Sequence, residues 1–117
     1  MRQMEASTSV TERVVRMLES VRDGRLLSLE DVAGQLHVSA RTLRRQLAAE
    51  GARFQLLQET VRHQRALDLL RRYSPLSIDD IADHLGYSDP SNFGRAFRKW
   101  EGISPSAWRR LHQTEGD

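Results

Sequence analysis

The sequence predicts an all-α fold of about seven helices. Apolar residues recur at the three- and four-residue spacing of helices, no stretch of any length carries a strand pattern, and one set of helix signals occurs twice. The two copies occupy residues 28–51 and 77–102, and residues 54–73 between them contain neither Gly nor Pro. We therefore predict two helix-turn-helix subdomains joined by a long central helix.

The chain has 117 residues, which suits one small domain or two miniature ones that share a helix. Residues 1–9 are polar and without periodicity, and are expected to be a flexible N-terminal segment. Residues 10–111 are the predicted domain, and residues 112–117 are expected to be a flexible tail.

Composition limits the function classes. There is no Cys, so neither a disulfide nor a thiolate metal site is available. The sequence has no secretory apolar segment and no apolar run near 18 residues. We therefore expect a soluble, cytoplasmic protein without membrane partners.

A first helix is predicted near the N-terminus. Ser9 begins a Ser-x-x-Glu capping box, and apolar residues follow at helical spacing from Val10 to about Arg22. Asp23-Gly24 is expected to end this helix.

The first helix-turn-helix is predicted from its caps. Ser28 and Asp31 have N-cap spacing, His37-Val38 forms the turn, Ser39 caps the second helix and Gly51 ends it. The residues expected to face inward are Leu29, Val32, Ala33, Leu36, Leu43 and Leu47.

The second helix-turn-helix repeats this pattern with a turn one residue longer, Gly86-Tyr87-Ser88. Ser77 is its first cap. Asp89 is the expected cap of the next helix, because Pro90 disfavours the α region before it and fits the first helical position. The inward residues are expected to be Ile78, Ile81, Ala82, Leu85, Phe93 and Phe97.

The central helix, residues 54–73, is apolar on more than one side, which suits a helix packed by both subdomains. Ser74-Pro75 is expected to end it. Ser104 and Pro105 predict a last short helix whose Trp108 folds back onto the second subdomain.

The cationic residues are almost all Arg, since Lys99 is the single Lys in a chain of net charge +2. At 100° per residue, Arg41, Arg44 and Arg45 lie on the face away from the inward leucines. An α-helix fits the major groove of DNA, where Arg can donate two hydrogen bonds to guanine. Two other readings are a merely solvated face and phosphate clamps.

Arg45 and Arg95 occupy equivalent positions in the two copies. Besides contacting DNA, each could form a structural salt bridge with an acid such as Glu50 or Glu101. The central helix carries four further arginines that are expected to be solvated: Arg62, Arg65, Arg71 and Arg72.

The second copy and the helix before it carry a specific family pattern. Its members are Arg62, Ala66, Leu69-Leu70, Ser77-Ile78, Ile81-Ala82, Leu85-Gly86-Tyr87-Ser88, Phe93, Arg95, Phe97, Gly102, Ser104-Pro105 and Arg109. On these residues the chain resembles the AraC/XylS family of bacterial transcription regulators, over about residues 10–110. Residues 41–51 resemble a branch whose full-length members carry a larger effector or dimerisation domain in front. The chain then resembles either an excised DNA-binding domain or a short stand-alone member.

The resemblance implies two recognition helices that enter successive major-groove segments of double-stranded DNA. From two such helices in one chain we expect a monomer on an asymmetric site of roughly 20 bp. The DNA-reading residues implied are Arg41, Thr42, Arg44 and Arg45 in the first helix, with Ser91, Asn92, Arg95 and Arg98 in the second. The caps expected near DNA are Ser28, Ser39, Ser77 and Asp89. Gly94 and Pro90 depart from the pattern, because neither can read a base with its side chain.

Catalysis has little support, so we expect no enzyme activity, no cofactor and no metal. The four histidines, at positions 37, 63, 84 and 112, are scattered without metal-ligand spacing. The acids at 79, 80 and 83 suit capping and the helix dipole. The alternative function is a helical protein-interaction module in which Trp100 or Trp108 anchors a partner such as RNA polymerase. Non-specific or RNA binding is weaker, since no aromatic platform is evident. As a DNA-binding regulator the protein is expected at the nucleoid.

Overall fold

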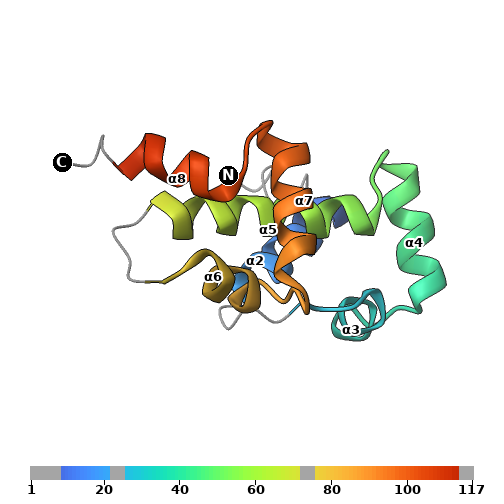
Figure 1. Cartoon of the computed structure of the whole chain (residues 1–117). Coiled ribbons are helices and arrows are strands. Elements are labelled where there is room, and N and C mark those ends of the chain that lie inside the picture. Colours follow the sequence, from blue (N-terminus) through green and yellow to red (C-terminus); the bar gives the residue numbers. More distant parts are fainter. Residues whose placement is uncertain (1–8, 22–25, 72–75, 114–117) are drawn as a thin grey trace, which may run out of the picture. The chain divides into compact units, whose positions relative to one another are not determined.

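The computed structural model describes residues 9–21, 26–71 and 76–113, and these contain helices and no strand. Figure 1 labels the helices. Their bounds are α2 Val10–Ser20, α3 Leu29–Gln35, α4 Ala40–Ala49, α5 Phe54–Arg71, α6 Ile78–His84, α7 Pro90–Glu101 and α8 Pro105–Gln113. The all-α prediction is confirmed. The described residues divide into two compact units, with the boundary between Val61 and Arg62 inside α5.

The first unit consists of α2, α3, α4 and the start of α5. Its core is formed by Val14, Leu18, Leu27, Leu29, Val32, Ala33, Leu43, Leu47 and Val61. Leu43 and Leu47 are 0% and 1% exposed, as their helical spacing predicts. Val38 packs against the same cluster, which is consistent with a hydrophobic staple onto Leu43.

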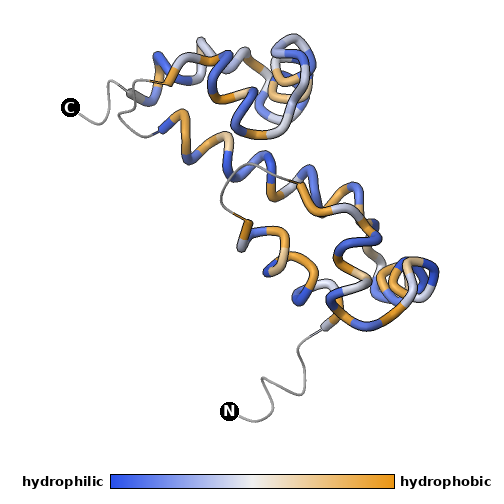
Figure 2. Tube along the Cα trace, turned by 90° about the horizontal axis from the view of Figure 1, so that it is seen from below, coloured by the Kyte–Doolittle hydropathy of each residue, from blue (hydrophilic) through white to orange (hydrophobic). Residues whose placement is uncertain are grey.

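The second unit consists of the rest of α5 with α6, α7 and α8. Its core is formed by Ala66, Leu70, Ile81, Ala82, Leu85, Phe93, Phe97 and Trp108. The ring of Phe97 meets Phe93 and Trp108 edge-on, at centroid distances of 5.8 and 6.2 Å. Figure 2 shows the alternation of hydrophobic and hydrophilic residues along the helices that produces both cores.

Caps set the starts of the helices. Ser9, Ser28 and Ser77 each form a complete capping box with the acidic residue three positions later. Ser39 Oγ accepts the Thr42 N–H at 3.0 Å, and an Asp89 carboxylate oxygen accepts the Ser91 N–H at 2.9 Å.

The two helix-turn-helix turns share one geometry. Val38 N–H donates to the Ala33 carbonyl and Tyr87 N–H to the Ala82 carbonyl, both at 3.0 Å. Before each donor lies a residue with positive φ, His37 at 62° and Gly86 at 92°. The extra residue of the second turn therefore falls after Tyr87, at Ser88, immediately before the N-cap.

A long-range contact fastens the end of α4 to the start of α2. The Glu50 carboxylate accepts the Val10 and Thr11 N–H groups at 3.1 and 2.8 Å, and also the Thr11 hydroxyl. These bonds, led by that of the Thr11 hydroxyl, lower the pKa of Glu50. Glu50 thus satisfies two of the unpaired donors at the start of α2.

Most predicted helix limits agree with the structure. Gly51 and Gly102 take positive φ where the recognition helices end. The structure ends α2 at Ser20 rather than about Arg22, and it follows α5 to Arg71. The stop signals Asp23-Gly24 and Ser74-Pro75, the last two residues of the expected central helix and most of both predicted terminal segments lie outside the described residues.

The prediction that the arginines of α5 are solvated is wrong in part. The Arg62 guanidinium lies 4.3 Å from the Tyr87 ring centroid, and its Nε is buried. Arg71, which is exposed, lies 5.6 Å from the Trp108 ring centroid, and Arg65 is also engaged in a contact. The Tyr87 ring, in the turn before α7, attracts Arg62, and the Trp108 ring on α8 attracts Arg71. Spacing along α5 alone does not reveal these contacts. Arg72 lies outside the described residues.

Candidate nucleic-acid interface

The first candidate surface is the outer face of α4. Arg41, Arg44 and Arg45 are exposed there, opposite the buried Leu43 and Leu47. No residue in the described parts of the chain accepts a hydrogen bond or ion pair from these three guanidinium groups. Each therefore keeps its full set of donors for an external acceptor.

Thr42 differs from its three cationic neighbours. It is half-buried, and its Oγ1 lies 3.0 Å from Ser39 Oγ, within the cap of α4. Ser39 also holds the Thr42 N–H. Thr42 is thus tied to the start of the helix, and it has less freedom to reach outward than the arginines.

The second candidate surface is the outer face of α7. Ser91, Asn92, Arg95 and Arg98 are exposed, while Phe93 and Phe97 on the opposite face are both 0% exposed. Arg95 Nη2 donates to Asn92 Oδ1 one turn away. This bond orients both side chains and leaves the Asn92 amide donors and the remaining Arg95 donors available.

Gly94 lies within that face, and space is open around it. A Cβ built on Gly94 would meet nothing within 4 Å. Packing inside the protein therefore gives no reason for glycine at this helical position, where it costs stability.

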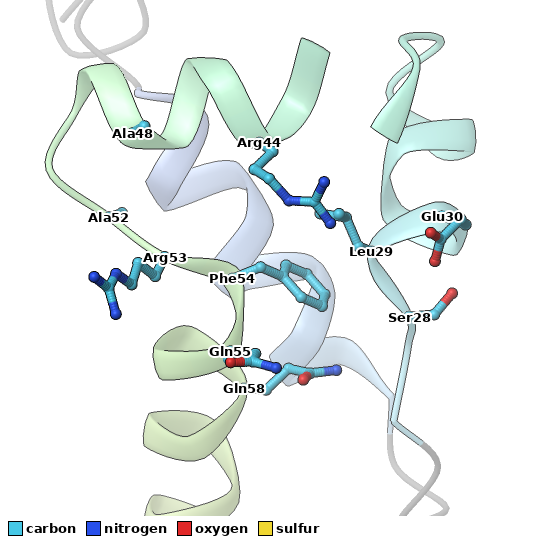
Figure 3. A pocket seen from close by; sticks show the side chains of 10 residues that line it. All are labelled: Ser28, Leu29, Glu30, Arg44, Ala48, Ala52, Arg53, Phe54, Gln55 and Gln58. Atoms are coloured by element: carbon cyan, nitrogen blue, oxygen red, sulfur yellow. The ribbon is translucent and has the colours of Figure 1, made fainter. Parts of the chain in front are cut away.

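A pocket adjoins the first surface. It has a volume of about 700 Å³ and is lined by Ser28, Leu29, Glu30, Arg44, Ala48, Ala52, Arg53, Phe54, Gln55 and Gln58. In Figure 3 the Phe54 ring lies between Arg44 and Gln58, and the Arg53 side chain extends away from the other side chains. The sequence pattern identified Arg44 but gave no sign of this hollow, because its walls come from α3, α4 and the start of α5.

The predicted caps all act as caps. The side chains of Ser28, Ser39, Ser77 and Asp89 each accept a backbone N–H of the helix that follows. All four residues are exposed. Sequence reasoning identified their capping role correctly.

The alternative ion pairs for Arg45 and Arg95 are absent from the described residues. Glu50 instead binds the start of α2, and the Glu101 carboxylate lies 2.6 Å from His63 Nε2. His63 also stacks on the Trp100 ring at a centroid distance of 4.7 Å. Sequence spacing could not reveal this triad, because His63 and Glu101 are 38 positions apart.

The two tryptophans offer little for a protein partner. Trp108 is 5% exposed in the core of the second unit and stacks on His112, with ring centroids 3.7 Å apart. Its fold-back onto the second subdomain is confirmed, and its burial argues against Trp108 as the anchor in the alternative function. Trp100 is half-buried against His63.

The described residues contain no group of three or more His, Cys, Asp or Glu side chains that could hold a metal ion. None of their helices combines the length and apolar character needed to cross a membrane.

Two capped helical hairpins, each with a cationic outer face on its second helix, define the helix-turn-helix class. A family model described as a helix-turn-helix domain matches residues 32–111. The chain belongs to the AraC-type helix-turn-helix family.

Among similar proteins is the ornithine utilization regulator of Pseudomonas aeruginosa, which is 44% identical over 95 residues. That match covers 81% of this chain and 28% of the regulator. The crystal structure of the transcriptional regulator CdpR from Pseudomonas aeruginosa has a TM-score of 0.80 and 44% identity, covering 86% of this chain and 31% of CdpR. The chain thus spans less than a third of these regulators.

A third match has a nucleic acid in its crystal. The DNA-binding domain of AdpA, a global transcriptional factor, was solved in complex with a target DNA. It is 27% identical with a TM-score of 0.72, and the match covers 92% of this chain and 96% of that domain.

Proposed function

We propose that this chain is the DNA-binding part of a transcription regulator and that it binds double-stranded DNA in a sequence-specific manner. The observation that carries the proposal is the pair of exposed faces on α4 and α7, each directly opposite two buried core residues. A helix fastened by its inner face presents its outer side chains in fixed directions, as base readout requires. Similarity to the AdpA domain, which was crystallised with DNA, supports the same function.

In this proposal α4 reads its half-site with long donors. Arg41, Arg44 and Arg45 have no partners among the described residues, and a guanidinium can donate two hydrogen bonds to guanine O6 and N7. An arginine of this set that does not reach a base contacts a phosphate instead. Thr42, held by Ser39, contributes a methyl or hydroxyl contact near the helix start.

The second helix reads differently in this proposal. Arg95 is its main base reader, and Asn92 holds it in position through Oδ1. A bidentate Asn–adenine contact would need that oxygen free, so Asn92 acts chiefly as a support for Arg95 and through its amide donors. Ser91 and Arg98 contact the sugar-phosphate backbone or a base that lies close.

One chain carries two recognition helices, the number that a symmetric helix-turn-helix dimer obtains from two chains. We propose binding as a monomer to an asymmetric site, with two major-groove segments about 10 bp apart and a footprint of roughly 20 bp. In this proposal the exposed caps Ser28, Ser39, Ser77 and Asp89 lie near the phosphates. The three serines suit that place better than Asp89, which is itself an anion. The nucleoid is the location that such binding implies.

Selection from a random duplex library, followed by base-by-base binding profiles, tests the proposal. Arg44→Ala should erase one base preference in the first half-site, and Arg95→Ala one in the second, each at a cost of about 1 to 3 kcal/mol. Arg16→Ala is the matched control, because Arg16 is exposed on α2, outside both faces. Profiles of Arg44→Ala and Arg95→Ala unchanged in shape would show that these side chains read no base.

The same assays separate DNA recognition from a pure protein-interaction module that contacts RNA polymerase. DNA recognition predicts salt-dependent binding, with log K falling by about 0.9 per log unit of salt for each phosphate neutralised. A module that binds protein alone would select no duplex and show no such slope.

A further inference from the structure

The pocket of the first unit has features of a small-molecule site. Its volume of about 700 Å³ lies inside the range of about 300 to 1,000 Å³ typical of ligand pockets. Its lining combines one aromatic ring, that of Phe54, with polar groups from three chain segments. Phe54 is half-buried and packs against the core, so its ring has a fixed place in the wall.

The lining favours an anion beside Arg44, whose guanidinium has no hydrogen-bond or ion-pair partner among the residues that the structure describes. Arg53 also belongs to the lining, although its side chain extends away from the others (Figure 3). Glu30 supplies the opposing carboxylate on the α3 wall. Arg44 and Phe54 both line this pocket (Figure 3), so a single small molecule inside it can touch both.

The opposite wall offers amides. Gln58 Nε2 donates to the Leu27 carbonyl at 2.7 Å, which fixes this side chain and leaves its carbonyl oxygen as an acceptor. Gln55 and Ser28 add neutral polar groups. Because these groups are neutral, the apolar part of a ligand can lie against this wall without contacting a charged side chain.

We infer that this pocket binds a small aromatic carboxylate, whose ring lies on Phe54 and whose carboxylate accepts hydrogen bonds from the Arg44 guanidinium. The inference rests on the proposed function in one respect: Arg44 belongs to the face of α4 that reads DNA. A ligand that engages Arg44 removes it from the DNA contact, so ligand and DNA weaken each other's binding by the same factor. The pocket is then a regulatory site inside the DNA-binding part itself.

The first test needs no DNA. The probe is 3-phenylpropionate, with neutral 3-phenylpropanamide as the matched control, titrated into the ¹⁵N-labelled chain and followed by NMR. A ligand of this size is expected to bind with a Kd on the order of 1 mM. Amide resonances of Leu29, Ala48 and Phe54 should shift saturably with the acid and far less with the amide.

Two exposed arginines on the same helix provide the variants. Arg44→Gln should weaken the acid about fivefold or more, because it removes a charge-assisted contact, whereas Arg45→Gln, outside the pocket lining, should leave the Kd unchanged. Absence of saturable shifts, equal binding of acid and amide, or an unchanged Kd in Arg44→Gln would each overturn the inference.

The second test adds a duplex selected by the chain. The acid at saturation should lower the DNA affinity of the wild type several-fold and leave that of Arg44→Gln unaltered, with sodium chloride matched throughout. An equal loss in both proteins would refute the coupling through Arg44. If no duplex is bound at all, the proposed DNA recognition fails while the result of the DNA-free titration stands.

Discussion

Replacing Gly94 by alanine should have opposite effects on the stability of the chain and on DNA binding by α7. The new methyl group meets nothing within 4 Å, and Gly94 is in the interior of a regular helix. Alanine is favoured over glycine in a helix interior by about 0.5 to 1 kcal/mol, so the free energy of unfolding should rise by about that amount. Urea unfolding followed by circular dichroism measures this change.

DNA binding should respond in the opposite direction. If α7 lies deep in the major groove, a methyl group on Gly94 contacts the bases or the backbone before the helix is seated. Overpacking of this kind costs about 1 to 3 kcal/mol, which corresponds to a Kd weaker by a factor of about 5 to 150. Fluorescence anisotropy with a selected duplex at fixed salt measures it.

Gly34→Ala is the matched control. Gly34 lies in α3 and is exposed, whereas Gly94 is half-buried, and a Cβ on Gly34 likewise meets nothing within 4 Å. It should stabilise the chain similarly while leaving the affinity for DNA unchanged. A Gly94→Ala chain that is more stable and binds DNA as tightly as the wild type would refute the close approach of α7.

Two further outcomes follow from the described contacts. The hydrogen bonds from Thr11 hold the pKa of Glu50 below its ordinary value of 4.5, so their stabilisation is complete above that value and is lost as the pH falls through the lowered pKa. Glu50→Gln should therefore lower Tm at neutral pH, and its Tm should approach that of the wild type in acid. The control Glu59→Gln, at an exposed site, should not lower Tm at neutral pH. A Tm difference between Glu50→Gln and the wild type that stays constant down to about pH 3 would contradict this reasoning. Gln64→Pro, at an exposed site inside α5, costs about 3 kcal/mol in helix stability and should reduce the two-segment footprint while each unit keeps its helical signal. Full affinity for the complete site in a folded Gln64→Pro chain would argue against a stiff central helix.

Local chemistry explains why so much of the fold could be predicted. A Ser with an acid three residues later fixes a helix start by two hydrogen bonds, and all three such boxes are present in the structure. Helical spacing likewise identified Leu43, Leu47, Phe93 and Phe97 as buried. These signals depend on neighbours within one or two turns, which the sequence displays directly.

The remaining contacts depend on partners that are distant in the chain. Glu50 meets Thr11 from 39 positions away and His63 meets Glu101 from 38, so no periodicity relates them. The pocket is similar, because its walls come from three segments that only packing brings together. The candidate DNA-reading faces were predictable because each lies on one helix.

The two recognition helices begin with the same register, counted from their caps. Ser39 and Asp89 are the N-caps, and the buried Leu43 and Phe93 both follow four residues later. The inserted Ser88 therefore lengthens the turn without rotating the outer face of α7, since the helix register is reset at Asp89. Any difference in how the two helices read DNA must then arise from the side chains themselves.

Those side chains differ at two equivalent outer positions, where α4 has Arg41 and Arg44 while α7 has Ser91 and Gly94. Long donors on α4 reach guanine from a helix that stays at the rim of the groove. A serine and a glycine leave room for the α7 backbone to come closer, where DNA shape and deformability contribute more to the binding energy. Under the proposed function, the first half-site is therefore specified mainly by hydrogen bonds and the second largely by the fit of the helix to the groove.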